Sequence, residues 1–79
     1  MIEIKILGSG CTKCIKLADL AKEAVAEMGL QASIEKVTEM QEIISYGVMR
    51  TPGLVVNGEV KISGRLPSKE NIMEILQTV

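Results

Sequence analysis

The hydrophobic period changes abruptly within the first thirty residues, and this change constrains the fold more than any other feature of the chain. Apolar and charged residues alternate from Ile2 to Leu7, as in a strand with one buried face. From Thr12 to Met28 the apolar residues recur every three or four positions, which predicts a helix with one buried stripe. A strand that leads directly into a helix predicts a strand–helix–strand unit, in which a right-handed crossover joins two parallel strands.

The middle of the chain predicts a second strand and a short helix. Residues 32–37 carry a weaker strand pattern with few apolar anchors, so we expect this strand at an edge of the sheet. Thr38 and Gln41 fit a capping box that opens a short helix, and Gly47 ends that helix.

The last third of the chain predicts a hairpin followed by a helix. Asn57-Gly58 separates two β-branched runs, which is the strongest short-range signal for a hairpin, and Ser68 caps the final helix. The resulting order is strand, helix, strand, helix, strand, strand, helix. This order predicts one α/β domain over residues 1–79, a compact four-stranded mixed sheet with helices on both faces. If the hairpin pairs with the first strand, that strand becomes central.

Both cysteines, Cys11 and Cys14, fall at the junction between the first strand and the first helix. The carboxyl end of a central strand is where open α/β sheets build their sites. The helical register places Cys14 in line with the buried stripe and Cys11 before it, where it can face water. Gly8-Ser9-Gly10 lets the backbone turn sharply ahead of them. We therefore expect an asymmetric pair, with one exposed thiol and one shielded thiol.

This asymmetry suits thiol–disulfide exchange. Only the thiolate is nucleophilic, and the unpaired N–H groups and dipole at a helix N-terminus favour the anion of Cys11. Lys13 and Lys16 add positive charge nearby. Cys11 is then the attacking nucleophile, and Cys14 resolves the mixed disulfide and leaves a bond between the two cysteines.

Two thiols at this spacing also suit a soft metal or metalloid, such as Cu(I), zinc or arsenic. Small metallochaperones place Cys-x-x-Cys between a first strand and a helix, but they end on a strand and usually carry Met where this chain has Ser9. A closed zinc site needs four ligands, and the sequence has two cysteines and no histidine. An inert pair is a third alternative, which the position at a strand end argues against. Metal handling by the same pair is the alternative to exchange, and we expect no resident metal.

The composition excludes several classes of partner. Aromatic residues make up 1% of the chain and the formal net charge is −1, so we expect no nucleic-acid partner. No apolar run reaches membrane-spanning length, so we expect no membrane partner. Met1 leads into a strand pattern rather than a signal peptide, which predicts a cytoplasmic protein. A permanent structural disulfide is unusual in a reducing cytoplasm, and this favours catalysis or metal binding.

The predicted core is aliphatic. Tyr46 is the only aromatic residue of the chain. Because methionine adapts to irregular gaps, we expect these residues as core filler: Met28, Met40, Met49 and Met73.

Thr51-Pro52 lies just before the third predicted strand. Together with Cys11-x-x-Cys14, the Asn57-Gly58 hairpin and the final helix, it resembles the thioredoxin/glutaredoxin superfamily. More closely, the chain resembles the small archaeal and bacterial thioredoxin-like redox-active disulfide proteins. The resemblance covers essentially the whole chain and implies a thioredoxin-like fold.

The resemblance implies an activity and its partners. A thiol–disulfide oxidoreductase of this kind uses the Cys11–Cys14 disulfide and no other cofactor. Its partners are a protein that carries a disulfide and an upstream reductase that recycles the pair. We expect a monomer.

The resemblance also implies a substrate-binding loop. Thr51 and Pro52 should be joined by a cis peptide bond and pack against the cysteines, and the Thr51 backbone should pair with a bound segment of the partner. Gly10, Thr12-Lys13 and Arg50 support the site, although thioredoxins carry an aromatic residue and Gly-Pro at the first two of these places. Two interpretations remain open for the basic residues of the chain. They could form a positive ring around the site, which would favour an acidic partner, or they could be scattered, solvated charges. These residues are Lys13, Lys16, Arg50, Arg65 and Lys69.

Overall fold

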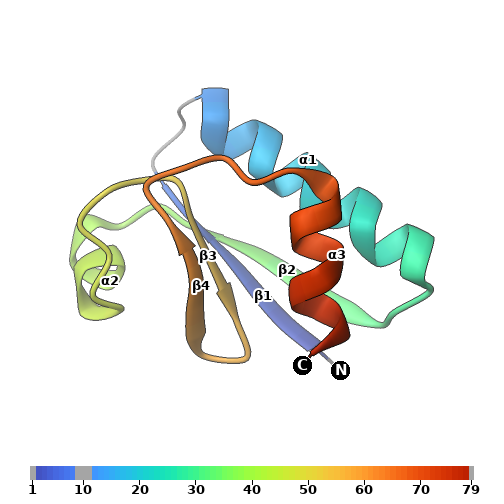
Figure 1. Ribbon diagram of the computed structural model, residues 1–79. Helices are drawn as coiled ribbons and strands as arrows, with labels where there is room; N and C mark the ends of the chain where they lie inside the picture. Colours follow the sequence, from blue (N-terminus) through green and yellow to red (C-terminus); the bar gives the residue numbers. More distant parts are fainter. Residues whose placement is uncertain (1, 9–11, 79) are drawn as a thin grey trace.

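The computed structural model describes residues 2–8 and 12–78. Every predicted helix and strand is present, in the predicted order (Figure 1). The elements are β1 (Ile2–Leu7), α1 (Thr12–Met28), β2 (Ala32–Val37), α2 (Met40–Ser45), β3 (Gly53–Val56), β4 (Glu59–Ser63) and α3 (Lys69–Gln77). Within the described ranges, no helix combines the length and the apolar character that crossing a membrane requires.

The four strands form one mixed sheet in the order β2-β1-β3-β4. β1 runs parallel to β2 and antiparallel to β3, so that Ile4 pairs with Ile34 on one side and with Val56 on the other. Gly8 N donates a hydrogen bond to Val37 O at 3.0 Å and extends the pairing past the end of β1. The sheet confirms that β1 is central and that β2 is an edge strand.

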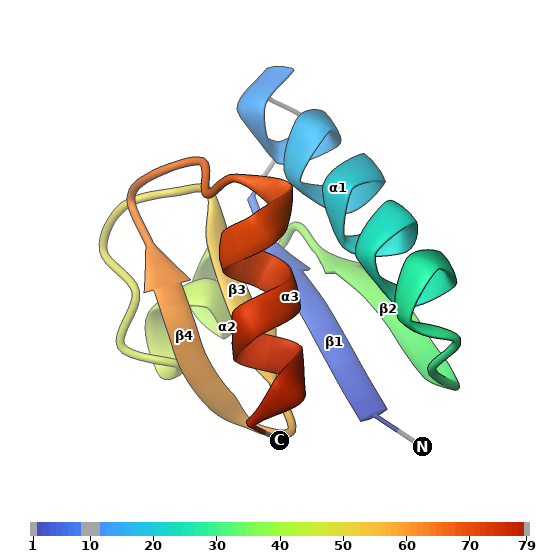
Figure 2. The ribbon, with the colours of Figure 1, turned by 45° about the vertical axis from the view of Figure 1, so that its right-hand side comes forward.

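Helices cover both faces of the sheet. Figure 2 shows α1 and α3 in front of the sheet and α2 behind it. Because side chains alternate along a strand, Ile4 and Ile6 of β1 face α1 and α3, whereas Leu7 is packed on the side of α2. The front core is the larger; its helical members are Leu17, Ala18, Ala21, Ala24, Ile72 and Leu76. The rear core consists of Leu7, Val37, Ile43, Val48 and Val55, with Tyr46 packed against it.

The hairpin between β3 and β4 closes as the sequence predicts. Asn57 and Gly58 both have positive φ, 50° and 83°, as a two-residue type I′ turn requires. Asn57 also ties the turn to the start of β1. Its N–H donates to Glu3 O at 2.8 Å, and its side-chain Oδ1 accepts from Glu3 N at 2.9 Å.

The two predicted helix caps have different outcomes. Ser68 caps α3 as expected, and its hydroxyl accepts a hydrogen bond from Asn71 N at 3.1 Å. The capping box of Thr38 and Gln41 is wrong, because the N-cap of α2 is Glu39 and no side chain caps this helix. The chain stays extended for one residue more than the motif predicts, with Glu39 at φ −78° and ψ 126°.

The methionines divide into two groups. Met28 and Met73 are packed against the front core, as expected of filler. The same expectation is wrong for Met40, which is 61% exposed, and for Met49, which is 87% exposed. Met40 is exposed because α2 buries a single residue, Ile43, and turns the rest of its surface to solvent, whereas Met49 lies in the loop after α2.

Candidate functional site

Cys14 lies in the first turn of α1, on the stripe of that helix that faces the sheet. Its side chain is 5% exposed, and its sulfur is disulfide-bonded. This burial confirms the helical register expected for Cys14. The other members of the predicted pair and its turn, Ser9, Gly10 and Cys11, lie outside the described residues.

Gly8 brings the end of β1 into direct contact with Cys14. A Cβ atom at Gly8 would overlap Cys14 Sγ and lie 3.2 Å from Cys14 Cβ. The same atom would lie 3.6 Å from the Cβ of Thr51. A glycine at this position therefore lets three segments meet: the end of β1, the first turn of α1, and the loop before β3.

The loop before β3 presents Thr51 to solvent and buries Pro52. The peptide bond between them is cis, the isomer that the resemblance implies. Gly64 N donates a hydrogen bond to Pro52 O at 2.9 Å, so the segment after β4 holds this loop in place. Arg50 lies against the same segment, since a Cβ at Gly64 would be 3.1 Å from Arg50 Cβ.

A small pocket opens on the other side of Cys14. Its volume is about 80 Å³, and its lining residues are Ile6, Gly8, Cys14, Ile15, Lys36 and Thr38. Lys36 and Thr38 come from the end of β2, whereas Thr51 precedes β3, and β1 separates these two strands in the sheet. Cys14 thus has the loop of Thr51 on one side and this pocket on the other.

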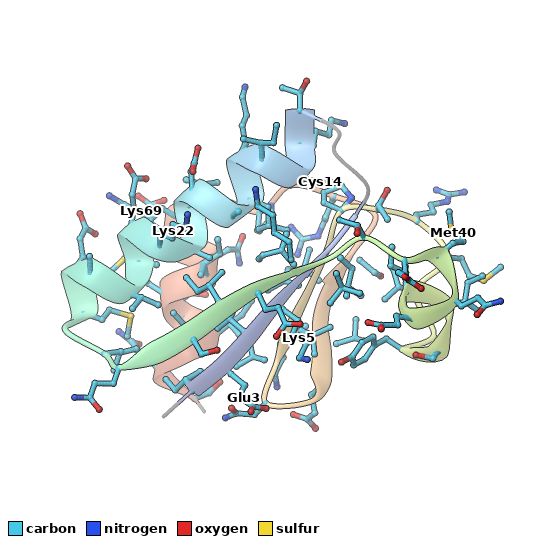
Figure 3. The ribbon with its side chains drawn as sticks, turned by 180° about the vertical axis from the view of Figure 1, so that it is seen from behind. Glu3, Lys5, Cys14, Lys22, Met40 and Lys69 are labelled. Atoms are coloured by element: carbon cyan, nitrogen blue, oxygen red, sulfur yellow. The ribbon has the colours of Figure 1, made fainter. Side chains whose placement is uncertain are left out.

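Of the five basic residues that could ring the site, Lys69 lies outside it, whereas three of the residues expected to support the site face solvent. Thr12, Lys13 and Arg50 are exposed, as supporting residues of an accessible site would be. Lys69 is elsewhere: Figure 3 shows it along α1, away from Cys14. It forms an ion pair with Glu27 in the last turn of α1, with 2.9 Å between Nζ and Oε1. Thirteen residues of helix, about 20 Å, separate Glu27 from Cys14, so Lys69 cannot contribute to the site.

The Glu27 carboxylate also changes the titration of its partner. It raises the pKa of Lys69 above the ordinary lysine value of 10.5, first through the hydrogen bond and then through charge attraction. The side chain of Lys69 is therefore committed to joining α3 to α1.

Sequence reasoning missed the roles of Gly8, Lys36 and Thr38. The sequence explains Gly8 as a residue that helps the chain to turn, but its distinctive property is contact with Cys14. The signal for Lys36 lies in the alternation of β2. Ala32 and Ile34 are packed against the front core, and Lys36 stands where the next apolar residue of that face would fall. The pocket lies at this interruption.

The metal alternative depends on the same pair of cysteines. Among the described residues, no three histidine, cysteine, aspartate or glutamate side chains gather as metal ligands. A soft ion at the predicted pair would therefore depend on Cys14 and on Cys11, which lies outside the described ranges.

Comparison with known proteins points to one family. The sequence matches the family described as "Thioredoxin domain" over residues 2–77. A protein named thioredoxin from Methanothermobacter thermautotrophicus is 49% identical over 76 residues, which cover 96% of this chain and 99% of that protein. A protein of the same name from Methanocaldococcus jannaschii is 40% identical over 78 residues, covering 99% of this chain and 90% of that protein.

Proposed function

Because the chain belongs to the thioredoxin domain family, a family of thiol–disulfide oxidoreductases, we propose that Cys11 and Cys14 are its redox-active pair. Membership confirms the resemblance drawn from the sequence, and the mixed sheet with helices on both faces agrees with a thioredoxin-like fold. We take residues 1–79 as one domain that acts on disulfides of partner proteins in the cytoplasm. It uses no cofactor besides its own disulfide.

The proposed reaction transfers two electrons from the reduced pair to the partner. The Cys11 thiolate attacks one sulfur of the partner disulfide, forms a mixed disulfide and releases the second partner sulfur as a thiolate. The Cys14 thiolate then attacks the Cys11 sulfur, which forms the Cys11–Cys14 disulfide and releases the first partner sulfur. Protons from water convert both partner thiolates to thiols. An upstream reductase returns two electrons and two protons to the pair.

The observation that carries this proposal is the environment of Cys14. A disulfide-bonded cysteine that is 5% exposed, against Gly8 and beside Thr51, is out of reach of a folded partner protein. It remains within reach of a sulfur one helical turn away. These properties suit the resolving thiol and leave the attack to Cys11, the only other cysteine of the chain.

The partner would bind across the loop before β3. Thr51 is exposed there, and the buried Pro52 and the hydrogen bond from Gly64 hold its backbone in place. We propose that this backbone pairs with an extended segment of the partner, in the manner of an added strand. Thr12, Lys13 and Arg50 are exposed and support the contact.

The first test alkylates the reduced protein with iodoacetamide across a range of pH. We expect Cys11 to react well before Cys14, with an apparent pKa below the value of about 8.5 for a free thiol. Mass spectrometry of peptides assigns each modification to its residue. Slow alkylation of both thiols at equal rates contradicts the division of roles.

The second test uses Cys14→Ser, which should trap mixed disulfides with partners, because the resolving thiol is absent. Cys11→Ser is the matched control and should trap none. Stoichiometric copper, zinc or arsenic that remains on the reduced wild-type protein, and is lost in Cys11→Ser, would instead support metal handling.

A further inference from the structure

The pocket beside Cys14 combines an apolar wall with a single charge. Ile6 and Ile15 supply the apolar wall, and Ile15 is 49% exposed although it is a large aliphatic residue. Lys36 is the only charged residue among the described residues that line the pocket. Its side chain is exposed and forms no ion pair with any described residue. The charge of Lys36 is therefore available to a ligand.

The position of the pocket follows from the edge strand. β2 borders β1 on one side only, so within the described sheet no further strand covers the end where Lys36 and Thr38 lie. On its front face Ala32 and Ile34 are packed against the core, and the row ends at Lys36. The pocket lies where a further apolar side chain of β2 would have packed against the first turn of α1.

The size of the pocket selects one kind of occupant. A volume of about 80 Å³ is well above the roughly 10–15 Å³ that a cavity needs to hold one water molecule, and far below the roughly 300–1,000 Å³ of a site for a drug-sized ligand. An engineered apolar cavity of about 150 Å³ holds benzene, so a single aliphatic side chain is a suitable occupant here.

We propose that this pocket is a specificity subsite of the thiol–disulfide reaction, which receives an aliphatic side chain of the partner next to its reacting cysteine. Lys36 pairs with a carboxylate that neighbours the aliphatic residue in the partner. The inference rests on the proposed function and adds a substrate class to it: disulfides flanked by an aliphatic and an acidic residue. The subsite lies on the β2 side of Cys14, separate from the loop of Thr51 on the β3 side.

Charge complementarity argues for this occupant. A carboxylate at the rim would meet the exposed ammonium of Lys36, while the aliphatic side chain covers Ile15. An aliphatic residue alone would gain nothing from the lysine, and a basic residue would be repelled by it. A partner segment with both features matches both parts of the pocket.

The test uses peptides in which one cysteine forms a mixed disulfide with thionitrobenzoate. The reduced protein attacks the peptide sulfur and releases the coloured thionitrobenzoate anion, which gives kcat/KM for each peptide. Four peptides carry Leu-Glu, Leu-Gln, Ala-Glu or Ala-Gln beside the cysteine. In each variant the ratio between two peptides removes any change in the reactivity of the protein thiols, because both peptides meet the same thiols.

For the wild-type protein we expect Leu-Glu to exceed Leu-Gln about threefold, the size of one exposed ion pair. We expect Leu-Glu to exceed Ala-Glu about tenfold, because the aliphatic side chain fills the pocket. Lys36→Glu should reverse the preference for Glu over Gln, and Ile15→Ala should reduce the preference for Leu. The matched control is Lys22→Glu, which makes the same charge change on the part of α1 that is distant from Cys14 (Figure 3).

The outcomes separate the subsite from the reaction. Equal rates for Leu-Glu and Leu-Gln in the wild-type protein would overturn the subsite. An unchanged preference for Leu-Glu over Leu-Gln in Lys36→Glu would overturn it as well. The wild-type ratios decide the question even if a variant fails to fold. A wild-type protein that leaves hydroxyethyl disulfide intact contradicts the proposed function itself. A dimer in sedimentation that Lys36→Glu dissociates would assign the pocket to contacts between copies and overturn the proposal.

Discussion

Gly8 and Cys14 are in contact so close that no side chain fits between them: a Cβ at Gly8 would overlap Cys14 Sγ. Gly8 directly follows the last residue of the central strand, and Cys14 begins the buried stripe of α1. The sulfur is therefore held against backbone, with Thr51 on the adjacent side. This contact fixes where a resolving thiol can lie relative to the sheet.

Gly8→Ala should destabilise the protein by about 1–3 kcal/mol, because a methyl group forced against the sulfur must displace the first turn of α1. The measurement is denaturant unfolding of the oxidised protein. Gly29→Ala is the matched control. Gly29 has φ +63°, but a Cβ added there would meet nothing within 4 Å, so this change costs only the backbone strain of about 1 kcal/mol. If the two variants unfold at the same denaturant concentration, the contact with Cys14 accommodates the added methyl group without an additional loss of stability.

Asn57 makes two separable contributions to the β3–β4 hairpin. Asn57→Gly keeps the left-handed backbone but removes the side-chain acceptor of Glu3 N, which should cost about 0.5–1.5 kcal/mol. Asn57→Ala adds left-handed strain of about 1–2 kcal/mol to that loss. Urea unfolding of the two variants measures the difference. If Asn57→Gly and Asn57→Ala are equally stable, the backbone strain at φ 50° contributes little to the free energy of unfolding.

The sequence determines most of the fold because its strong signals are local. The period change at residues 8–12 sets β1 and α1 with the observed bounds, and the pair Asn57-Gly58 places the turn of the hairpin. The capping box predicted at Thr38 is wrong because such a motif depends only on the residues within it. The start of α2 depends instead on the packing of Ile43 in the rear core. The expectation for Met40 and Met49 is wrong for a related reason, since composition shows neither which face of α2 is buried nor whether a loop residue reaches the core.

The candidate site is harder to predict, because its contacts join segments distant in sequence. The position of Cys14 on the buried stripe follows from helical register alone. The approach of Thr51 to Gly8 depends on the pairing of β3 with β1, and the pocket depends on the edge position of β2. The alternation of β2 marks Lys36 as an interruption of its apolar face, but that pattern alone does not show that a pocket lies there.

The two predicted caps give a direct comparison. Ser68→Ala should destabilise the protein by about 1 kcal/mol, because Asn71 N loses its acceptor at the start of α3. Thr38→Ala should change stability by less than about 0.5 kcal/mol, since α2 has no side-chain cap. Thermal unfolding of both variants at one pH measures this. If Thr38→Ala loses as much stability as Ser68→Ala, Thr38 does cap α2, and the prediction of a capping box there is correct.

The ion pair between Lys69 and Glu27 should make stability depend on pH at the alkaline end. Because the hydrogen bond with Glu27 raises the pKa of Lys69 in the folded protein, the folded state holds this proton more tightly than the unfolded chain. The contribution is fully present below the unfolded value of 10.5 and is lost as the pH rises through the higher folded pKa. The stability difference between wild type and Lys69→Met should therefore shrink above pH 10.5, and also in high salt, which screens an exposed pair. For the control on α1, Lys22→Met, the stability difference from the wild type should not shrink in this way. A difference between wild type and Lys69→Met that stays constant across this range would mean that Lys69 stabilises the contact of α3 with α1 through its aliphatic stem and not through its charge.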